Sequence, residues 1–456
     1  MPLLQVDETR HVALRCLSTI THHGGATIRA QIAAHASTFT KLIRDFPDDE
    51  TIIELSITVL SHSVVAVVEG DARPQFPDVL KSLDMVDIIK TTLENIKRPV
   101  WDPRALLEHS INLITMSSLN APYAFKAYPA AISFMTAGIR SKDWVTRSAC
   151  LGGLIRLYRT ESEPDQSTFD AMGFVNACQR QIPAHINAVL MAYGPMRCEI
   201  YVTTSCINEF QKAMFEVAGT HDLYKLGLKQ ANLILKSEWS VLNGTLQRQN
   251  PRTGEFVQHS DAGLPFTWWR DSLVHAAKAI RDKGKPNELD YADILEMKAT
   301  IQQNRTDDAI VLAEEALKRN PEQAYFYYVV SLSGDGIQGL RGAKKGLKCK
   351  IITPFVKFQM LQRAVDHAGD MGIKILQDMP EAGDKKWEEG TAFLMSALED
   401  AKRFMQEAPP DNRHMKNVLY WYILLSLLIK ETVSPDLREL DVRLWIPTPI
   451  NCVAHM

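Results

Sequence analysis

Cysteine is scarce in this sequence: there are seven among 456 residues, and none of them form a C-x-x-C pair. A sparse, odd set of thiols is typical of a reducing compartment and argues against a secreted disulfide framework. A zinc site needs ligands in pairs at short spacing. Cys452 and His455 form a lone C-x-x-H, and Cys198 and Cys206 have no close histidine, so we expect no metal.

An excess of either charge is also missing. The 51 Lys and Arg residues nearly balance the 54 Asp and Glu residues, which leaves a net charge of −3. No global electrostatic attraction to nucleic acid or to an anionic membrane follows, so we expect no nucleic-acid partner. Hydrophobic residues at 46% and charged residues at 23% are ordinary for a globular chain and exclude a disordered or fibrous protein.

Long apolar runs are lacking as well. The longest nearly unbroken run, Val418 to Ile429, is too short to span a bilayer. The first residues, MPLLQVDETR, lack the basic and apolar regions of a secretory signal. We therefore expect no membrane span and a cytoplasmic or nuclear location.

What the chain does contain is apolar residues at helical spacing almost throughout, with little strand-like alternation. Three stretches resemble one another in this spacing: Asp49 to Val68, Arg104 to Leu119 and Asp143 to Tyr158. Their starts lie about 40 to 55 residues apart, which brackets the period of armadillo (ARM) and HEAT repeats. The third stretch also has the Asp-x-Val-x-Arg pattern that opens the inner helix of many HEAT units, and Asp143 is its expected N-cap. The alternative is an irregular helical domain with coincidental spacing.

A second type of repeat is indicated further along the chain. Ala309, Ala316 and Pro321 have the spacing of a tetratricopeptide (TPR) unit, in which two helices cross too closely for larger side chains. We expect Asn304 in the turn between these two helices and Tyr325 in the helix that follows.

Further helices are expected towards the end of the sequence. Thr353 and Pro354 form an N-cap and a first-turn proline. The three helices predicted from this point run from Phe355 to Leu376, Lys386 to Met405 and His414 to Ile429. Ser434-Pro435-Asp436 opens one more, which Ile446-Pro447-Thr448-Pro449 stops, so the end of the chain is either a cap or a truncation.

These patterns predict an all-α, right-handed α-solenoid of ARM/HEAT-like helix pairs followed by TPR-like helix pairs. We place ARM/HEAT-like repeats in residues 1–160, a continuing helical region in 161–236, a long irregular loop or boundary in 237–267, and a TPR-like region in 268–456. The boundary segment is rich in Asn, Gln, Gly, Ser and Pro. We expect it to pack back on the solenoid through Trp268 and Trp269, which start the next helix.

Two strings resemble catalytic motifs. Gly334 to Gly339 matches G-x-G-x-x-G and follows an apolar run from Tyr325 to Leu332, as a dinucleotide-binding loop would. That fold also needs several more strand–helix units, which the sequence does not offer, so we favour a turn between two helices. His22-His23-Gly24-Gly25 is similar to the oxyanion motif of lipases, but no G-x-S-x-G elbow accompanies it, and we expect a loop after the first helix.

The densest basic run consists of Lys344, Lys345, Lys348 and Lys350, flanked by Arg341. On a helix, Arg341, Lys344 and Lys348 would share one face and could dock an acidic peptide or a phosphate. The alternative is a solvated helix face. These five residues are our candidates for partner binding, and we expect no catalytic, cofactor-binding or metal-binding residue.

Several linear strings resemble a fungal, chiefly basidiomycete, family of α-solenoid proteins that usually end in a MYND zinc finger. They are Asn250 to Gly254, Gly263 to Thr267, Gly342 to Lys350, Trp387 to Gly390 and Ser434 to Asp441. In such relatives the helices are an interaction scaffold, and the finger binds proline-rich peptides. The finger is missing here, since after Cys349 only Cys452 remains, so no residue inherits a metal role.

The function that these patterns favour is a non-catalytic protein–protein interaction scaffold. It would present a solenoid groove to a peptide or a partner helix and would need no cofactor. The alternatives are a nucleotide-using enzyme with a phosphate loop at Gly334 to Gly339, and a truncated product of a MYND-finger protein.

Overall fold

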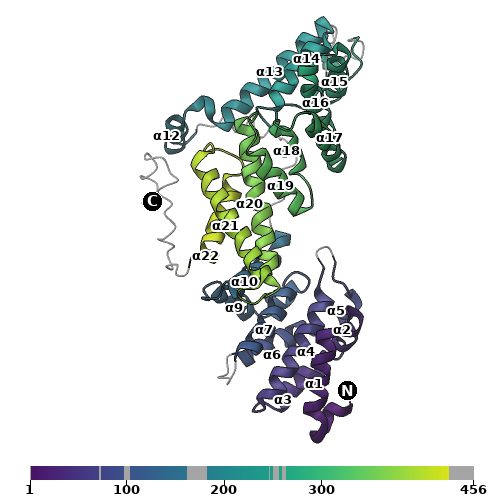
Figure 1. Cartoon of the computed structure of the whole chain (residues 1–456), viewed down its shortest axis with the longest axis vertical. Coiled ribbons are helices and arrows are strands. Elements are labelled where there is room, and N and C mark those ends of the chain that lie inside the picture. The colour runs from purple at the N-terminus through teal and green to yellow at the C-terminus, as the bar shows by residue number, and fades with distance from the viewer. Residues whose placement is uncertain are drawn as a thin grey trace. The chain divides into compact units, whose positions relative to one another are not determined.

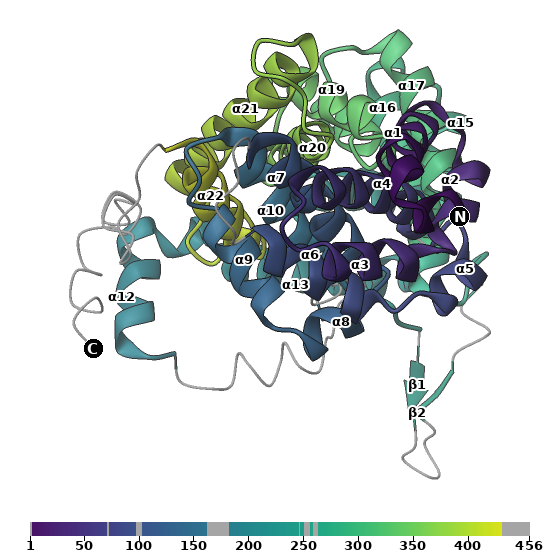
Figure 2. The ribbon, with the colours of Figure 1, turned by 90° about the horizontal axis from the view of Figure 1, so that it is seen from below.

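The protein is built of α-helices, as the computed structural model shows in Figures 1 and 2. The structure describes residues 2–70, 73–96, 103–161, 182–245, 247–249, 256–258 and 263–430. The strands in these ranges are one short antiparallel pair, β1 (Gln247–Gln249) and β2 (Phe256–Gln258). The predicted all-α class is therefore confirmed.

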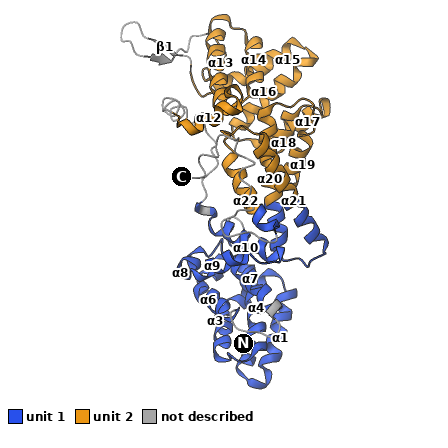
Figure 3. Ribbon diagram, turned by 90° about the vertical axis from the view of Figure 1, so that its left-hand side faces the viewer, with its two compact units in different colours: residues 1–165, 370–394, 426–437 blue, residues 166–369, 395–425, 438–456 orange. Residues whose placement is uncertain are grey.

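The chain divides into two compact units (Figure 3). The first unit contains residues 1–165, 370–394 and 426–437, and the second contains residues 166–369, 395–425 and 438–456. The segment 237–267, which we expected to be a boundary, thus belongs to the second unit. Each unit is described by the contacts among its own helices.

The helices of the first unit follow one another with short connections. They are α1 (Asp7–His23), α2 (Ala26–Ala33), α3 (Ala36–Asp45), α4 (Glu50–Val68), α5 (Pro77–Ser82), α6 (Met85–Ile96), α7 (Pro103–Ser117), α8 (Pro122–Ala127), α9 (Ala130–Gly138) and α10 (Trp144–Leu157), with 3-10 turns η1 (Pro2–Gln5) and η2 (Arg159–Glu161). Helix α4 lies at the centre and contacts α1, α2, α3 and α7. The core of the unit therefore forms around α4.

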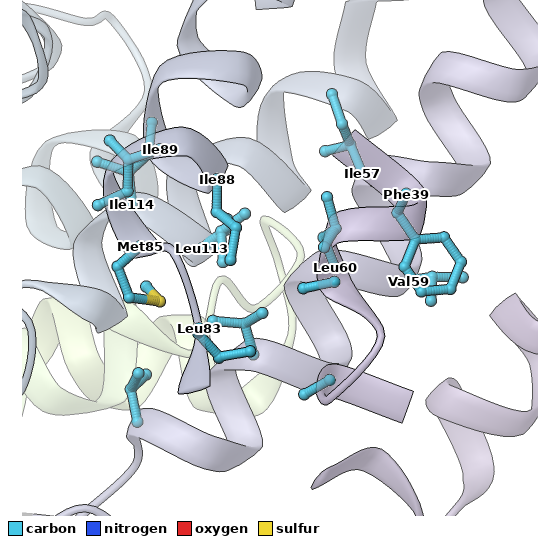
Figure 4. Close-up of a cluster of buried hydrophobic side chains, with 14 of the residues drawn as sticks. Phe39, Ile57, Val59, Leu60, Leu83, Met85, Ile88, Ile89, Leu113 and Ile114 are labelled. Carbon is cyan, nitrogen blue, oxygen red and sulfur yellow. The ribbon is translucent and has the colours of Figure 1, made fainter. Parts of the chain in front are cut away.

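Helix α4 is the one described helix that is long and apolar enough to cross a membrane, with a mean hydropathy of 1.9 in its most apolar window. Of that window, 72% is buried inside the structure. The side chains of Ile57 and Leu60 belong to the same buried cluster as Ile88 of α6 and Leu113 of α7 (Figure 4). Burial on nearly all sides accounts for the composition of α4, because a helix surrounded by other helices has no polar face.

The three stretches that resemble one another in sequence form α4, α7 and α10. Helix α7 packs against both of the others. Asp49 accepts the backbone N–H of Ile52 at 2.9 Å, and Asp143 accepts that of Thr146 at 2.7 Å, so a carboxylate caps α4 and α10. The buried guanidinium of Arg147 donates to the backbone oxygen of Leu428 at 2.9 Å. The expected N-cap at Asp143 is confirmed.

The helices of the second unit include the pair for which the sequence predicts a TPR-like unit. The elements are α12 (Ala184–Tyr193), η3 (Pro195–Arg197), α13 (Glu199–Thr220), α14 (Leu223–Ile234), η4 (Trp269–Asp271), α15 (Ser272–Lys283), η5 (Pro286–Glu288), α16 (Leu289–Gln302), α17 (Thr306–Arg319), α18 (Ala324–Val330) and α19 (Gly336–Gly346), followed by α20 (Pro354–Gln377), α21 (Lys385–Glu407) and α22 (Met415–Ile429), which contribute to both units. From α14 to α19, each helix packs on the next.

The turn between α16 and α17 has the conformation that the sequence indicates. Asn304 has a φ of 59°, in the left-handed region that asparagine tolerates better than most residues. Ala309 and Ala316 are buried where α17 meets its neighbours, and Tyr325 is buried in α18. The predicted turn at Asn304 and the predicted helical position of Tyr325 are confirmed.

The segment before α15 packs back on the helices through one tryptophan of the predicted pair. Trp269 is buried, and its ring lies edge-on to Phe210 at 5.9 Å between centroids. Trp268 is half exposed. Residues 246, 250–255 and 259–262 of this segment lie outside the described residues, as do the helix expected from Ser434 and the Cys452 and His455 pair.

Replacing Leu60 by Ala should lower the free energy of unfolding by about 2–5 kcal/mol, because Leu60 is fully buried in α4 and a cavity would remain. The measurement is urea unfolding of the full chain, followed by circular dichroism. Val12→Ala in α1, where the side chain is 62% exposed, is the matched control and should change little. Equal losses in the two variants would contradict the central place of α4.

Candidate functional site

The second unit contains a cavity of about 830 Å³. It is lined by η3, the first turn of α13, the segment after α14, the start of α20 and the end of α21. Apolar side chains make most of its wall, among them Met196, Val202, Phe355, Phe358 and Pro409. A volume of this size is typical of sites that bind small molecules or the side chains of a partner.

Hydrogen bonds between distant segments hold this wall together. The hydroxyl of Thr353 accepts the N–H of Val356 at 3.4 Å, which confirms the predicted N-cap of α20. The same hydroxyl donates to the backbone oxygen of Leu235 at 2.5 Å, at the end of α14. On the other side, the hydroxyl of Tyr193 donates to the backbone oxygen of Glu407 at 3.1 Å. These polar contacts join the separate segments that form the wall of the cavity.

The N-terminus of α13 is bound to the turn between α21 and α22 in the same way. The carboxylate of Asp411 accepts the backbone N–H groups of Glu199 and Ile200 at 3.0 and 2.9 Å. In return, Glu199 Oε2 accepts the backbone N–H of Arg413 at 3.0 Å. Burial raises the pKa of the Glu199 carboxyl, although the bond from Arg413 opposes it. Such reciprocal capping satisfies the free N–H groups of a helix start.

A buried ionic cluster lies directly behind the wall, one residue beyond Ser237. Glu238 accepts from Lys298 Nζ at 2.8 Å and from the hydroxyl of Tyr328 at 2.9 Å. Arg413 Nη2 lies 4.0 Å from Glu238 Oε2. Burial alone would raise the pKa of Glu238, but the charges of Lys298 and Arg413 outweigh it and lower the pKa to about 2. Glu238 is therefore ionised in the folded protein.

His414 completes this cluster as a neutral group. Burial lowers its pKa to about 3, and the charges of Arg413 and Arg363 act in the same direction. Its Nε2 accepts from Arg413 Nε at 3.0 Å. The cluster thus joins the segment after α14 with α16, α18 and the α21–α22 turn, all of which meet behind the cavity.

The predicted partner-binding residues lie elsewhere in the second unit, and none of them lines the cavity. Lys344, on α19, forms an ion pair with Asp400 of α21. Helix α19 ends at Gly346, so Lys348 and Lys350 lie in the turn after it. The expectation that Lys348 shares a helical face with Arg341 and Lys344 is therefore wrong. Arg341, Lys345, Lys348 and Lys350 are exposed and form no ion pair with any residue that the structure describes.

The G-x-G-x-x-G string lies where α18 and α19 meet: Gly334 and Asp335 belong to the turn between them, and Gly336 to Gly339 form the first turn of α19. The apolar run before it forms α18 rather than a strand, and Asp335 caps α19 by accepting the N–H of Ile337 at 2.8 Å. A Cβ at Gly339 would lie 2.4 Å from Nε2 of His367, so the glycine permits close packing against α20. The turn that we favoured is therefore present, but it contains only the first two residues of the string.

The His-His-Gly-Gly string ends α1 and begins the connection to α2, as expected. Its histidines lie in a row with two others: ring centroids are 4.7 Å apart for His22 and His23, 5.3 Å for His22 and His62, and 4.9 Å for His62 and His109. No pattern in the sequence points to His62 and His109, because only the packing of α4 on α7 brings them together. In the ranges that the structure describes, no group of three His, Cys, Asp or Glu side chains is arranged to hold a metal ion.

No protein-family model, curated protein or solved structure matches the chain. The resemblance to fungal α-solenoid proteins therefore stays a prediction. Function has to be inferred from the residues around the cavity.

Replacing Glu238 by Gln should lower the free energy of unfolding by about 3–5 kcal/mol, because Lys298 would remain buried without its counter-charge. Chemical unfolding of the full chain at neutral pH measures this loss. Glu216→Gln is the matched control: its pair with Lys225, at 2.6 Å, is exposed, and its removal should change stability little. Similar losses of unfolding free energy in both variants would contradict the conclusion that the buried cluster stabilises the fold.

The histidine row should make the first unit sensitive to acid. Burial lowers the pKa of His62 from 6.5 to about 4, and the charges of His109, His22 and Arg29 act in the same direction. Below pH 6.5, His62 therefore binds a proton in the unfolded chain but stays neutral in the folded chain. Folding stability is lost as the pH falls from 6.5 towards 4, because protonation favours the unfolded chain. The measurement is hydrogen exchange of α4 peptides across this range. His62→Gln should flatten the profile, and His35→Gln, at an exposed position, should not.

Proposed function

We propose that this chain is a non-catalytic scaffold that binds a segment of a partner polypeptide in the cavity of the second unit. The observation that carries the proposal is the cavity itself, with about 830 Å³ of space and mainly apolar walls. A groove of this kind can take up apolar side chains of a peptide or of a partner helix. The fixed contacts around it favour binding, since a preformed wall needs little ordering when a partner arrives.

The packing of the helices supports the finer proposal of a right-handed α-solenoid. In the first unit, the three similar stretches α4, α7 and α10 pack in series, as the inner helices of ARM/HEAT-like repeats would. In the second unit, the helices from α14 to α19 pack in succession and bury Ala309 and Ala316, as the crossing of a TPR-like pair would. Both series have the nearest-neighbour contacts that repeat proteins use to present concave surfaces.

The thiols support a location in a reducing compartment, the cytoplasm or the nucleus. Among the described residues, the cysteines are free: Cys16, Cys150, Cys198, Cys206 and Cys349. Burial raises the pKa of Cys150 to about 12 and that of Cys198 to about 11, so these thiols stay protonated. Protonated, buried thiols are inert packing groups.

A peptide-display selection against the full chain tests the proposed function. It should enrich peptides that bind the wild-type protein, and Val202→Trp should weaken their binding at least about tenfold, because the indole would occupy the cavity. Dissociation constants from fluorescence anisotropy give the comparison. Val274→Trp, at an exposed position on α15, is the matched control and should bind as the wild type does.

Two outcomes would contradict the scaffold proposal. One is the absence of any enriched peptide, and the other is a set of peptides whose affinity is the same for the wild type and Val202→Trp. A thermal shift with nucleotides is a useful companion measurement, since a ligand at 100 times its dissociation constant stabilises a protein by about 2.7 kcal/mol. A shift that is abolished by Gly334→Ala, at a glycine where an added Cβ would meet open space, would favour a nucleotide-binding protein instead.

A further inference from the structure

The carboxylates of the cavity wall have hydrogen-bond or ion-pair partners within the protein, whereas some of its cations form no ion pair with a residue that the structure describes. Of the two glutamates in its wall, Glu407 is paired with Lys357 and also accepts from Arg403 Nε at 3.2 Å. Glu199 accepts the backbone N–H of Arg413, and the nearby Asp411 caps the start of α13. The carboxylates at this site are therefore already bound to donors of the protein itself.

Two cations of the wall are left without a carboxylate. Arg197 and Lys236 are exposed, and neither forms an ion pair with a residue that the structure describes. The guanidinium of Arg197 lies 4.7 Å above the ring of Tyr193, which holds it at the cavity. Lys236 follows the end of α14, next to Ser237 of the wall. The rim thus presents positive charge to whatever enters.

The apolar part of the wall lies in the same cavity as these cations. Phe355 packs against Tyr328 at 6.0 Å between centroids, and Phe358 packs against Phe404 at 6.0 Å, so both rings are fixed in place. Met196, by contrast, is 80% exposed and can adapt to an entering group. Because Met196 is exposed to solvent, a side chain of a partner segment can reach the cavity from this side.

We propose that the partner segment is acidic: an apolar or aromatic side chain enters the cavity while flanking Asp or Glu carboxylates bind Arg197 and Lys236. This inference rests on the proposed function and names the chemistry of the partner. Charge complementarity selects the segment, because a basic peptide would bring its cations against Arg197 and Lys236. The apolar wall provides the contact area, and the two cations determine which residues of the partner segment lie at the cavity.

The test uses synthetic fluorescent peptides with a central Phe flanked by Glu, by Gln or by Lys, and the full-length protein. Fluorescence anisotropy should show the Glu peptide binding at least about tenfold more tightly than the Lys peptide. The Arg197→Glu/Lys236→Glu variant should reverse this order. Added salt should weaken the Glu peptide more than the Gln peptide, because exposed charges are screened.

The matched control is Lys345→Glu/Lys348→Glu, which reverses two exposed cations that do not line the cavity. It should leave the order of the three peptides unchanged. If this variant weakens the Glu peptide and the Arg197→Glu/Lys236→Glu variant does not, the inference is overturned and the acidic partner belongs to the basic run near α19. If display selects peptides that depend on Val202 but carry no acidic residues, the inference fails while the proposed function stands. If neither display-selected nor synthetic peptides bind, both fail.

Discussion

The carboxylate of Glu238 is the group around which the second unit is arranged. It accepts from Lys298 of α16 and from Tyr328 of α18, and Arg413 approaches it from the α21–α22 turn. A buried charge is costly unless its counter-charges are present, so the segments that carry these groups have to meet at one place. Ser237 and Asn412, which line the cavity, are sequence neighbours of Glu238 and Arg413. The cluster behind the wall thus determines where the wall lies.

The first unit is organised by the opposite kind of interaction. Its central helix, α4, is buried on nearly all sides, and the cluster around Ile57 and Leu60 consists of apolar side chains. Apolar burial is non-directional, which suits a core in which several helices contact one helix. Among the polar groups of this unit, Asp49 and Asp143 cap the starts of α4 and α10.

The cavity combines both kinds of interaction. Its aromatic wall is held by packing, whereas the surrounding helix ends are held by hydrogen bonds such as those of Asp411 and Thr353. The carboxylates take part in these bonds, and Arg197 and Lys236 remain at the rim. A preformed apolar space with positive charge at its edge is suited to bind an acidic, partly apolar segment, and the scaffold function that we propose makes use of this arrangement.

The amino-acid sequence by itself determined the features that depend on near neighbours in the chain. These are the all-α class, the caps at Asp143 and Thr353, the turn at Asn304 and the small residues at Ala309 and Ala316. Helical periodicity, capping and turn chemistry act within a few residues, so they can be recognised in a linear string. Only the tertiary structure decided which distant residues meet. It paired Lys344 with Asp400, aligned His22, His62 and His109, and assembled the cavity from residues between Tyr193 and Asn412. These contacts depend on how helices far apart in the chain pack together, and no local pattern in the sequence encodes that packing.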